Sequence, residues 1–340
     1  MQVPIPQTES TTGKPTATAI FIGVDVAKAE LVVAQHDPMQ TKQAGTTVVN
    51  DTASIAQWLS TLPANSHVAM ESTGRYHGLL AQLAHQAGHT VYVLNARDVY
   101  HYAQALGMRG KTDRLDAQVI ARYLGEHHMH LHPWSPPSDV QQQLDALLSR
   151  RALLGKHQSM LKLSFKEVGL SSIQSQVTHL MAEFEVLMSC IDAQVQVLIA
   201  SDASLAEGCA RLRTITGIGA QISALLANLF SRIPFANADA VVAFCGLDPR
   251  PQDSGAKRGR RRLSKRGPAL LRRQIWLAGF SATKSKVFAP IYKALRARNL
   301  PTTAAIAILG RRLLRIAFAV WKSGKPFDPS QIGCVGAKTA

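Results

Sequence analysis

The chain of 340 residues is long enough for one large domain or a few ordinary ones. Its 38 Lys and Arg residues against 22 Asp and Glu residues give a formal charge of +16, while 46% of its residues are apolar, as in globular proteins. These values exclude a disordered polycation and indicate a folded protein with an anionic partner, most simply a nucleic acid.

The sequence shows no sign of export or membrane insertion. The four cysteines, at positions 190, 209, 245 and 334, lack the spacing of a zinc site and the density of a disulfide scaffold, so we expect reduced thiols. No apolar run approaches the roughly 18 residues of a membrane span, and residues 1–16 lack the regions of a signal peptide. We therefore expect a cytoplasmic protein with a disordered N-terminus and no membrane partner.

The pattern of residues 17–132 predicts an α/β domain. Five β-rich runs lie at 18–26, 30–36, 46–50, 67–72 and 90–95. Helical stretches are predicted at 54–62, 76–86, 97–106 and 113–124. Three consecutive strands followed by strands that alternate with helices are typical of the ribonuclease-H-like fold.

A helical arm is predicted after a proline-rich linker at 133–138. The arm, 139–205, contains two helical runs at 140–168 and 173–199. Apolar residues recur in the second run at spacings of three and four, at Ile173, Val177, Leu180, Phe184, Leu187, Ile191, Val195 and Leu198. This seam predicts a helical hairpin or an oligomerising coiled coil, and an intramolecular bundle arm stays open because periodicity does not say which helix fills the seam.

The last predicted domain, 206–340, is mainly α-helical. Its segment TITGIGAQISALLANL (214–229) has the turn of a helix-hairpin-helix, in which backbone N–H groups near Gly217 and Gly219 bind a phosphate. A tight turn that needs the backbone freedom of glycine is the alternative.

Four acidic residues lie at the ends of two predicted strands and at the start of one predicted helix. Asp25 lies at the end of the first strand and Glu71 at the end of the fourth, and these strands are adjacent and parallel in a ribonuclease-H-like sheet. Asp113 and Asp116 are three residues apart at the start of a helix and therefore share a face. A turn residue, a helix cap and two N-terminal helix charges are the alternatives.

Carboxylates brought together repel one another unless cations neutralise them, so the four acids predict a divalent-metal site. Oxygen ligands favour Mg²⁺ over zinc, with Mn²⁺ as an alternative, and two ions suit in-line phosphoryl transfer. The histidine-rich tract HHMHLH (127–132) lacks partner cysteines, and we expect it to be solvated or in contact with RNA rather than to bind a metal.

Residues 250–273 form a basic block with ten Lys or Arg residues and one acid, Asp253. Its glycines and prolines predict a loop that grips several phosphates. The residues expected to contact nucleic acid there are Arg250, Lys257, Arg258, Arg260, Arg261, Arg262, Lys265 and Arg266. Within the block, Ser254 precedes a glycine and is a candidate nucleophile, although the residues alone do not distinguish it from Ser264.

In order and over nearly the whole chain, these motifs resemble the DEDD transposases of the insertion sequence one hundred and ten (IS110) family, relatives of the Piv and MooV invertases. The resemblance is carried by the helical arm and by GVDVAK (23–28), ESTG (71–74), KTDRLDA (111–117), TGIG (216–219), FCGLDP (244–249) and DSG (253–255). It implies a RuvC-like catalytic domain with Asp25, Glu71, Asp113 and Asp116, and a transposase domain whose nucleophile is Ser254.

The resemblance also implies a mechanism and partners. A covalent phosphoserine would conserve the energy of each broken phosphodiester until the strands of donor and target DNA are rejoined. Some members are guided by a structured noncoding (bridge) RNA, and we expect a dimer or tetramer acting at the bacterial nucleoid. The main alternative is a RuvC-like Mg²⁺-dependent endonuclease that uses water as its nucleophile; a sugar-kinase-like ATPase and a non-enzymatic nucleic-acid chaperone are weaker ones.

Overall fold

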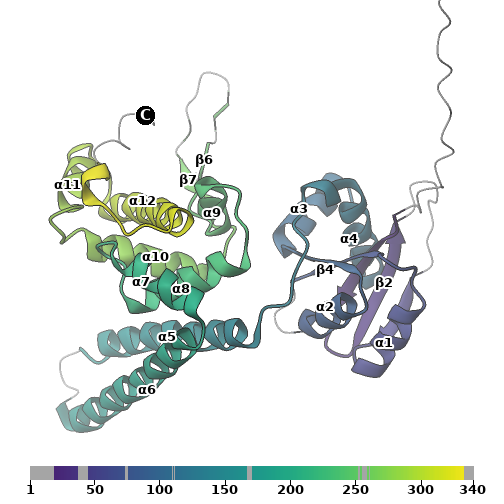
Figure 1. Ribbon diagram of the computed structural model, residues 1–340, viewed down its shortest axis with the longest axis horizontal. Coiled ribbons are helices and arrows are strands. Elements are labelled where there is room, and N and C mark those ends of the chain that lie inside the picture. Colours follow the sequence, from purple (N-terminus) through teal and green to yellow (C-terminus); the bar gives the residue numbers. More distant parts are fainter. Residues whose placement is uncertain are drawn as a thin grey trace, which may run out of the picture. The chain divides into compact units, whose positions relative to one another are not determined.

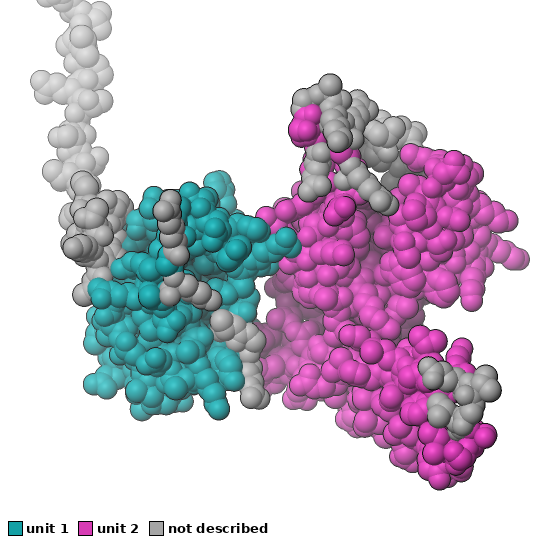
Figure 2. Space-filling model, turned by 180° about the vertical axis from the view of Figure 1, so that it is seen from behind, with its two compact units in different colours: residues 1–136 teal, residues 137–340 magenta. Residues whose placement is uncertain are grey.

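The computed structural model describes residues 19–36, 45–72, 76–108, 110, 112–166, 171–251, 253–254, 259 and 261–332. The chain divides into two compact units, Met1–Pro136 and Pro137–Ala340, which are coloured separately in Figure 2. The expectation for residues 1–16 lies outside the described residues.

Unit 1 is built on a five-stranded mixed sheet (Figure 1). Its strands are β1 (Phe21–Val26), β2 (Glu30–His36), β3 (Thr46–Val49), β4 (His67–Glu71) and β5 (Thr90–Leu94). They lie in the order β3-β2-β1-β4-β5, with antiparallel pairing in the first three and parallel pairing of β1 with β4 and of β4 with β5. The predicted α/β character of this unit is confirmed.

Helices cover both faces of the sheet, and each face has its own core. On one face α1 (Thr52–Ser60) and α2 (His77–Gln86) bury Ile55 and Leu80 against the strands. On the other, α3 (Ala96–Ala105) and α4 (Asp113–His127) bury Val99 and Ile120. Burial of aliphatic side chains on both faces explains why the central strands are almost continuously apolar.

Helix α4 approaches β1 unusually closely because residue 23 is a glycine. A Cβ atom at Gly23 would lie 2.1 Å from the backbone nitrogen of Ala121 and 2.3 Å from the carbonyl oxygen of Ala117. No side chain fits there, so the backbone of α4 rests directly on the strand.

The histidine tract closes the other end of α4 instead of being wholly solvated. His127 and His128 are half-buried, and each donates from Nδ1 to a helix carbonyl, that of Tyr123 at 3.0 Å and that of Gly125 at 3.1 Å. The ring of His128 also packs 4.6 Å from that of Phe21. His130 and His132 are exposed, and among the described residues no histidine joins a metal-binding cluster.

Unit 2 is helical in the part of the chain that the structure describes, apart from a short hairpin of β6 (Pro249–Arg250) and β7 (Arg262–Leu263). Its α-helices, several of which are labelled in Figure 1, are α5 (Asp139–Ser164), α6 (Gln174–Ala200), α7 (Ala203–Arg213), α8 (Ala220–Arg232), α9 (Ala238–Phe244), α10 (Ala269–Ala282), α11 (Ala289–Ala297) and α12 (Thr302–Ser323). The predicted helical C-terminal region is confirmed. Among the described residues no single helix is long and apolar enough to cross a membrane. Residues 171–200 and α7, which are bent by 119° relative to each other, have the length and apolar composition of a span only when they are taken together.

Helices α5 and α6 form a hairpin, and the predicted seam is divided along it. Ile191 and Val195 are buried in the same apolar cluster as Leu144 and Leu148 of α5. Toward the tip of the hairpin, Leu180 and Leu187 are 44% and 49% exposed. The half of the seam nearer α7 is therefore filled within the chain, whereas part of the other half faces solvent.

Candidate active site

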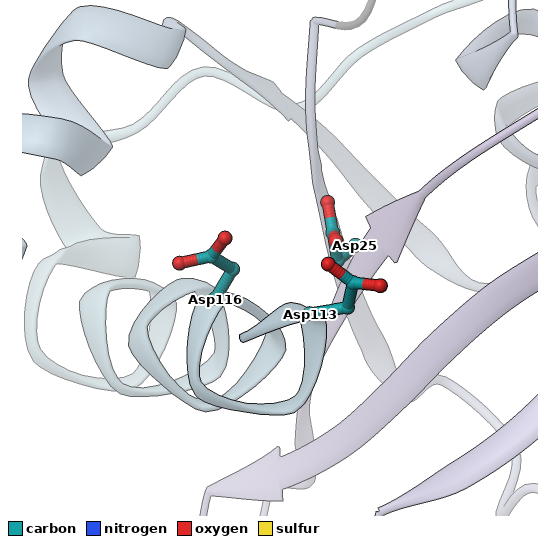
Figure 3. A group of neighbouring side chains, drawn as sticks. All are labelled: Asp25, Asp113 and Asp116. Atoms are coloured by element: carbon teal, nitrogen blue, oxygen red, sulfur yellow. The ribbon is translucent and has the colours of Figure 1, made fainter. Parts of the chain in front are cut away.

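Three of the four predicted acids come together in unit 1. One carboxylate oxygen from each of Asp25, Asp113 and Asp116 lies within 4.8 Å of the others. Figure 3 shows that Asp25 comes from β1, while Asp113 and Asp116 come from the first turn of α4. The cluster therefore joins one strand to the start of one helix.

The close contact at Gly23 accounts for this geometry. Side chains alternate along a strand, so Gly23 and Asp25 point to the same face of the sheet, the face that α4 covers. Thr112 begins α4 by accepting a hydrogen bond from the Leu115 amide at 3.3 Å. The positive end of the helix dipole favours the two acids in its first turn.

Glu71 lies at the same edge of the sheet as Asp25. It ends β4, and the parallel register pairs Val24 with Met70, so the next residues along the two strands are Asp25 and Glu71. Its carboxylate is not part of the 4.8 Å cluster, but its charge contributes to the electrostatics of Asp25.

The carboxyl group of Asp25 is strongly perturbed. Burial, followed by the negative charges of Asp116, Asp113 and Glu71, raises its pKa from 3.8 to about 6. A set of oxygen donors that repel one another in this way is the kind of site that a hard divalent cation stabilises. The donors present therefore fit a divalent metal.

The two candidate serines of unit 2 differ completely in their surroundings. Ser264 is 6% exposed, its hydroxyl donates to the Asp248 carboxylate, and its amide donates to the Asp248 carbonyl at 2.9 Å. Ser254 is exposed in the β6–β7 hairpin. The accessible hydroxyl is thus that of Ser254, whereas Ser264 closes the base of the hairpin through Asp248, the residue before β6.

An ion pair braces the hairpin beside Ser254. Asp253 accepts two hydrogen bonds from the Arg261 guanidinium, at 2.6 and 2.9 Å, and one from the Gly259 amide at 2.9 Å. These hydrogen bonds hold the pKa of Asp253 below its usual value. Part of the positive charge of Arg261 is consequently compensated within the protein.

The basic block is only partly a loop. It includes β7, and α10 begins at Ala269, so the prediction of a loop is wrong for Arg272 and Arg273. Arg272 donates to the carbonyl of Gly267 at 2.9 Å, which makes it a structural residue. Arg262, Lys265 and Arg266 are exposed and Arg250 is half-buried, whereas the predicted contacts Lys257, Arg258 and Arg260 lie outside the described residues.

The glycines of the TGIG turn have different roles. Gly217 has φ +99°, and a Cβ there would lie 2.9 Å from Cβ of Ala282, so the fold itself requires glycine. Gly219 is the N-cap of α8 at φ −88°, and a Cβ there would meet nothing within 4 Å. The backbone explanation therefore holds for Gly217 and not for Gly219.

Sequence reasoning missed Gly23, Asp248 and the Asp253–Arg261 pair. The glycine in the middle of a strand was a usable signal, because such a glycine often marks the close approach of another backbone. The partners of Asp248 and Asp253 depend on how the hairpin folds back, and no local pattern encodes them.

Comparison with known proteins defines the class. A family model described as "Transposase", for the DEDD transposases, matches residues 22–168, which include all four acids. A second, "Transposase IS116/IS110/IS902 family", matches residues 209–293, which include the TGIG turn and Ser254. These matches identify a DNA-processing enzyme of the transposase and recombinase class.

The chain belongs to the IS110 family of transposases. It is similar to the pilin gene-inverting proteins of Moraxella bovis and Moraxella lacunata. Each is 27% identical over 321 residues, which cover 91% of this chain and 97% of the relative.

Proposed function

We propose that this transposase cuts and rejoins DNA through a covalent phosphoserine at Ser254, assisted by divalent cations held by Asp25, Glu71, Asp113 and Asp116. The observation that carries the proposal is the convergence of three carboxylates within 4.8 Å, with the pKa of Asp25 raised to about 6. Carboxylates that converge in this way and perturb one another's pKa are typical of functional sites, and metal ligation is the role that relieves their repulsion.

Unit 1 is, in this proposal, a ribonuclease-H-like domain. Support comes from the strand order β3-β2-β1-β4-β5, with an antiparallel meander and two parallel crossovers. The acids at the ends of β1 and β4 lie where open α/β sheets bind ligands.

Mg²⁺ is the proposed metal, with two ions bound and Mn²⁺ as a substitute, because every proposed ligand is a carboxylate oxygen. When bound, such ions would stabilise the charge that develops on the attacking and leaving oxygens. The residues of the chain provide the rest: the acids orient the ions, and basic residues such as Arg262 and Lys265 neutralise phosphates near Ser254.

The chemical step is an in-line exchange at phosphorus. The Ser254 oxygen attacks and loses its proton to a base, while the 3′ oxygen departs with the bonding electrons and is protonated to a hydroxyl. The 5′ end is left as a phosphoserine ester. A 3′-hydroxyl from the partner strand then attacks this ester, which forms the new phosphodiester and frees the serine. Exposure of Ser254 supports this role, and burial of Ser264 argues against it for that residue.

A structured guide RNA and an oligomer complete the proposal. A formal charge of +16 suits a protein that holds both RNA and DNA backbones. The exposed seam residues Leu180 and Leu187, together with Met160 of α5 at 57% exposure, suit contact with a second copy. Leu187→Glu should lower the mass measured by light scattering, and an unchanged mass would contradict this contact.

The domains that carry the acids and the serine are separate compact units, so we also propose that a site is completed between protomers. Mixing Ser254→Ala protein with Asp25→Asn protein tests this point. Partial recovery of cleavage in the mixed oligomer is expected, and no recovery would assign each site to one chain.

The chemistry of the cut ends tests the proposed function against a water-using endonuclease. A plasmid carrying the DNA that flanks the coding sequence is incubated with protein and Mg²⁺, and its ends are labelled. We expect free 3′-hydroxyls and 5′ ends blocked by protein until protease treatment. Free 5′-phosphates, formed equally by Ser254→Ala, would instead establish the endonuclease.

A further inference from the structure

A second concentration of positive charge in unit 2 lies beyond the basic block. Residues 274–327 contain ten Lys or Arg residues and no Asp or Glu. Helix α12 contributes four of these cations, Arg311, Arg312, Arg315 and Lys322. Because this stretch has no acid of its own, partners for the cations must come from elsewhere in the chain or from a ligand.

Two of the three arginines of α12 have partners within unit 2. Arg312 donates to the carbonyl oxygen of Ile332 at 2.6 Å. Arg315 donates two hydrogen bonds, at 2.6 and 3.0 Å, to one carboxylate oxygen of Asp239, which lies in the first turn of α9. Both guanidinium groups therefore hold other parts of the unit in place.

Arg311 is half-buried but has no such partner. Its side chain makes no hydrogen bond or ion pair with any residue in the described ranges. Arg315 lies four residues further along the same face of α12, and the Asp239 carboxylate that partly offsets these charges is already bonded to Arg315. Burial, followed by the charge of Arg315, holds the pKa of Arg311 below its usual value. A cation in such surroundings costs free energy until an anion pairs with it.

The helices around Arg311 are the two that flank the β6–β7 hairpin. Helix α12 packs against α9, which precedes the hairpin, and against α10, which follows it (Figure 1). The contact with α10 is at the neighbouring residue, because a Cβ at Gly310 would lie 2.7 Å from the carbonyl oxygen of Ile275. The contact with α9 includes the Arg315–Asp239 pair, one turn further along. Arg311 therefore lies between these two contacts.

A phosphate is the anion that suits this position best. The guanidinium group is planar and donates two parallel hydrogen bonds to phosphate oxygens, a geometry that a lysine ammonium does not reproduce. The acid-free stretch at 274–327 adds attraction for a polyanion and no repulsion.

We propose that Arg311 is a phosphate-binding residue, left without a protein partner so that a phosphodiester of bound nucleic acid completes it. The contact holds the backbone beside the helices that flank the β6–β7 hairpin. The inference rests on the proposed function only in that the protein binds nucleic acid, and it needs neither the metal nor Ser254. DNA and RNA share the phosphodiester, and separate probes distinguish them.

Removal of the charge tests the contact. Fluorescence anisotropy of the full chain in EDTA is measured over a range of salt concentrations, with one sequence as duplex DNA and as single-stranded RNA. Arg311→Met keeps an apolar stem without the charge, so affinity for the contacted probe should fall at least about tenfold. The slope of log K against log salt should flatten by about 0.9 for the duplex or about 0.7 for the single strand. The probe whose slope flattens identifies the source.

Melting temperatures separate a binding residue from a structural one. Because Arg311 has no partner to lose, Arg311→Met should melt at the same temperature as the parent or slightly higher. Lys322→Met is the matched control, since it removes the same charge from an exposed position on α12 and should weaken binding much less. Arg311→Lys keeps the charge without the planar fork and should bind with intermediate affinity. A lower melting temperature for Arg311→Met, unchanged affinity for both probes, or an equal loss in Lys322→Met would overturn the proposal.

Asp239→Asn tests the opposite sign. Loss of this carboxylate frees Arg315 beside Arg311, so affinity for the same probe should rise several-fold and the salt slope should steepen. The Arg315 and Asp239 side chains are 42% and 77% exposed, so the melting temperature should change little. Unchanged or weaker binding would overturn the proposal. Normal binding by the parent without any DNA adduct, together with weak binding by Arg311→Met, would refute the phosphoserine mechanism and support this inference.

Discussion

The three carboxylates of unit 1 and the serine of unit 2 are held in opposite ways. Asp25 and the start of α4 are fixed by backbone packed on backbone at Gly23. Ser254 lies in an exposed hairpin that the Asp253–Arg261 ion pair braces. The proposed metal site needs ligands placed within a fraction of an ångström, whereas the proposed nucleophile, on a surface hairpin, has room to meet a bulky DNA substrate.

The largest expected effect comes from breaking the backbone contact. Gly23→Ala places a Cβ 2.1 Å from the Ala121 nitrogen, so α4 must shift, and unfolding of unit 1 should be easier by about 3 kcal/mol. Urea denaturation, with hydrogen exchange of β1 to assign the transition, measures this. Gly78→Ala is the control, because a Cβ there meets nothing within 4 Å. Equal stability of the two variants would refute the packing argument.

A smaller effect of opposite sign is expected at Asp25. Because the pKa of Asp25 is raised from 3.8 to about 6 in the folded protein, its protonated form favours folding, and the contribution of Asp25 to the stability of the metal-free protein is lost as the pH rises from about 4 through 6. Asp25→Asn removes this penalty and, after allowance for solvent screening, should add about 1 kcal/mol at pH 7.5 in EDTA. Cleavage should nevertheless fall at least about 100-fold. Thermal melting of both proteins at pH 4 and 7.5 checks the sign, because the gain from Asp25→Asn should be present at pH 7.5 and absent at pH 4; a gain that does not grow with pH would contradict it.

The smallest stability effect is expected at Arg261. The Arg261 and Asp253 side chains are 49% and 40% exposed, and solvent screens such a pair, so Arg261→Ala should leave the melting temperature almost unchanged. Formation of the DNA adduct should still fall on the order of tenfold, because Ser254 loses its positioned neighbour. A fall in melting temperature as large as that of Gly23→Ala would contradict a loosely held hairpin.

The sequence predicted the sheet and most of the acid cluster well. Apolar runs such as 18–26 and 67–72 mark strands buried on both faces, and adjacency of two parallel strands is enough to bring Asp25 and Glu71 to one edge. The helical position of Asp113 and Asp116 followed from their spacing.

Features set by distant packing were not predictable. The apolar residues of the seam at 173–198 recur with one continuous period. Ile191 of α6 is nevertheless buried in the same cluster as residues of α5, while Leu187 is exposed, because α5 covers only part of the seam. Ser254 and Ser264 lie in similar sequence surroundings, and only the fold of the hairpin onto Asp248 separates them. The sequence predicts a histidine tract that is solvated or in contact with RNA, and the partial burial of His127 and His128 was not predictable because it depends on how the end of α4 packs against Phe21 at the start of β1.

The central claim is that Ser254 becomes covalently bound to DNA under the control of the acid cluster. Its most direct test is mass spectrometry of nuclease-trimmed adducts from the parent chain and from Ser254→Ala, Ser264→Ala and Asp25→Asn. We predict a nucleotide on Ser254 in the parent chain and in Ser264→Ala, provided that this variant melts at the same temperature as the parent. No nucleotide is expected in Ser254→Ala or Asp25→Asn. A normal adduct yield from Ser254→Ala or from Asp25→Asn would contradict the account.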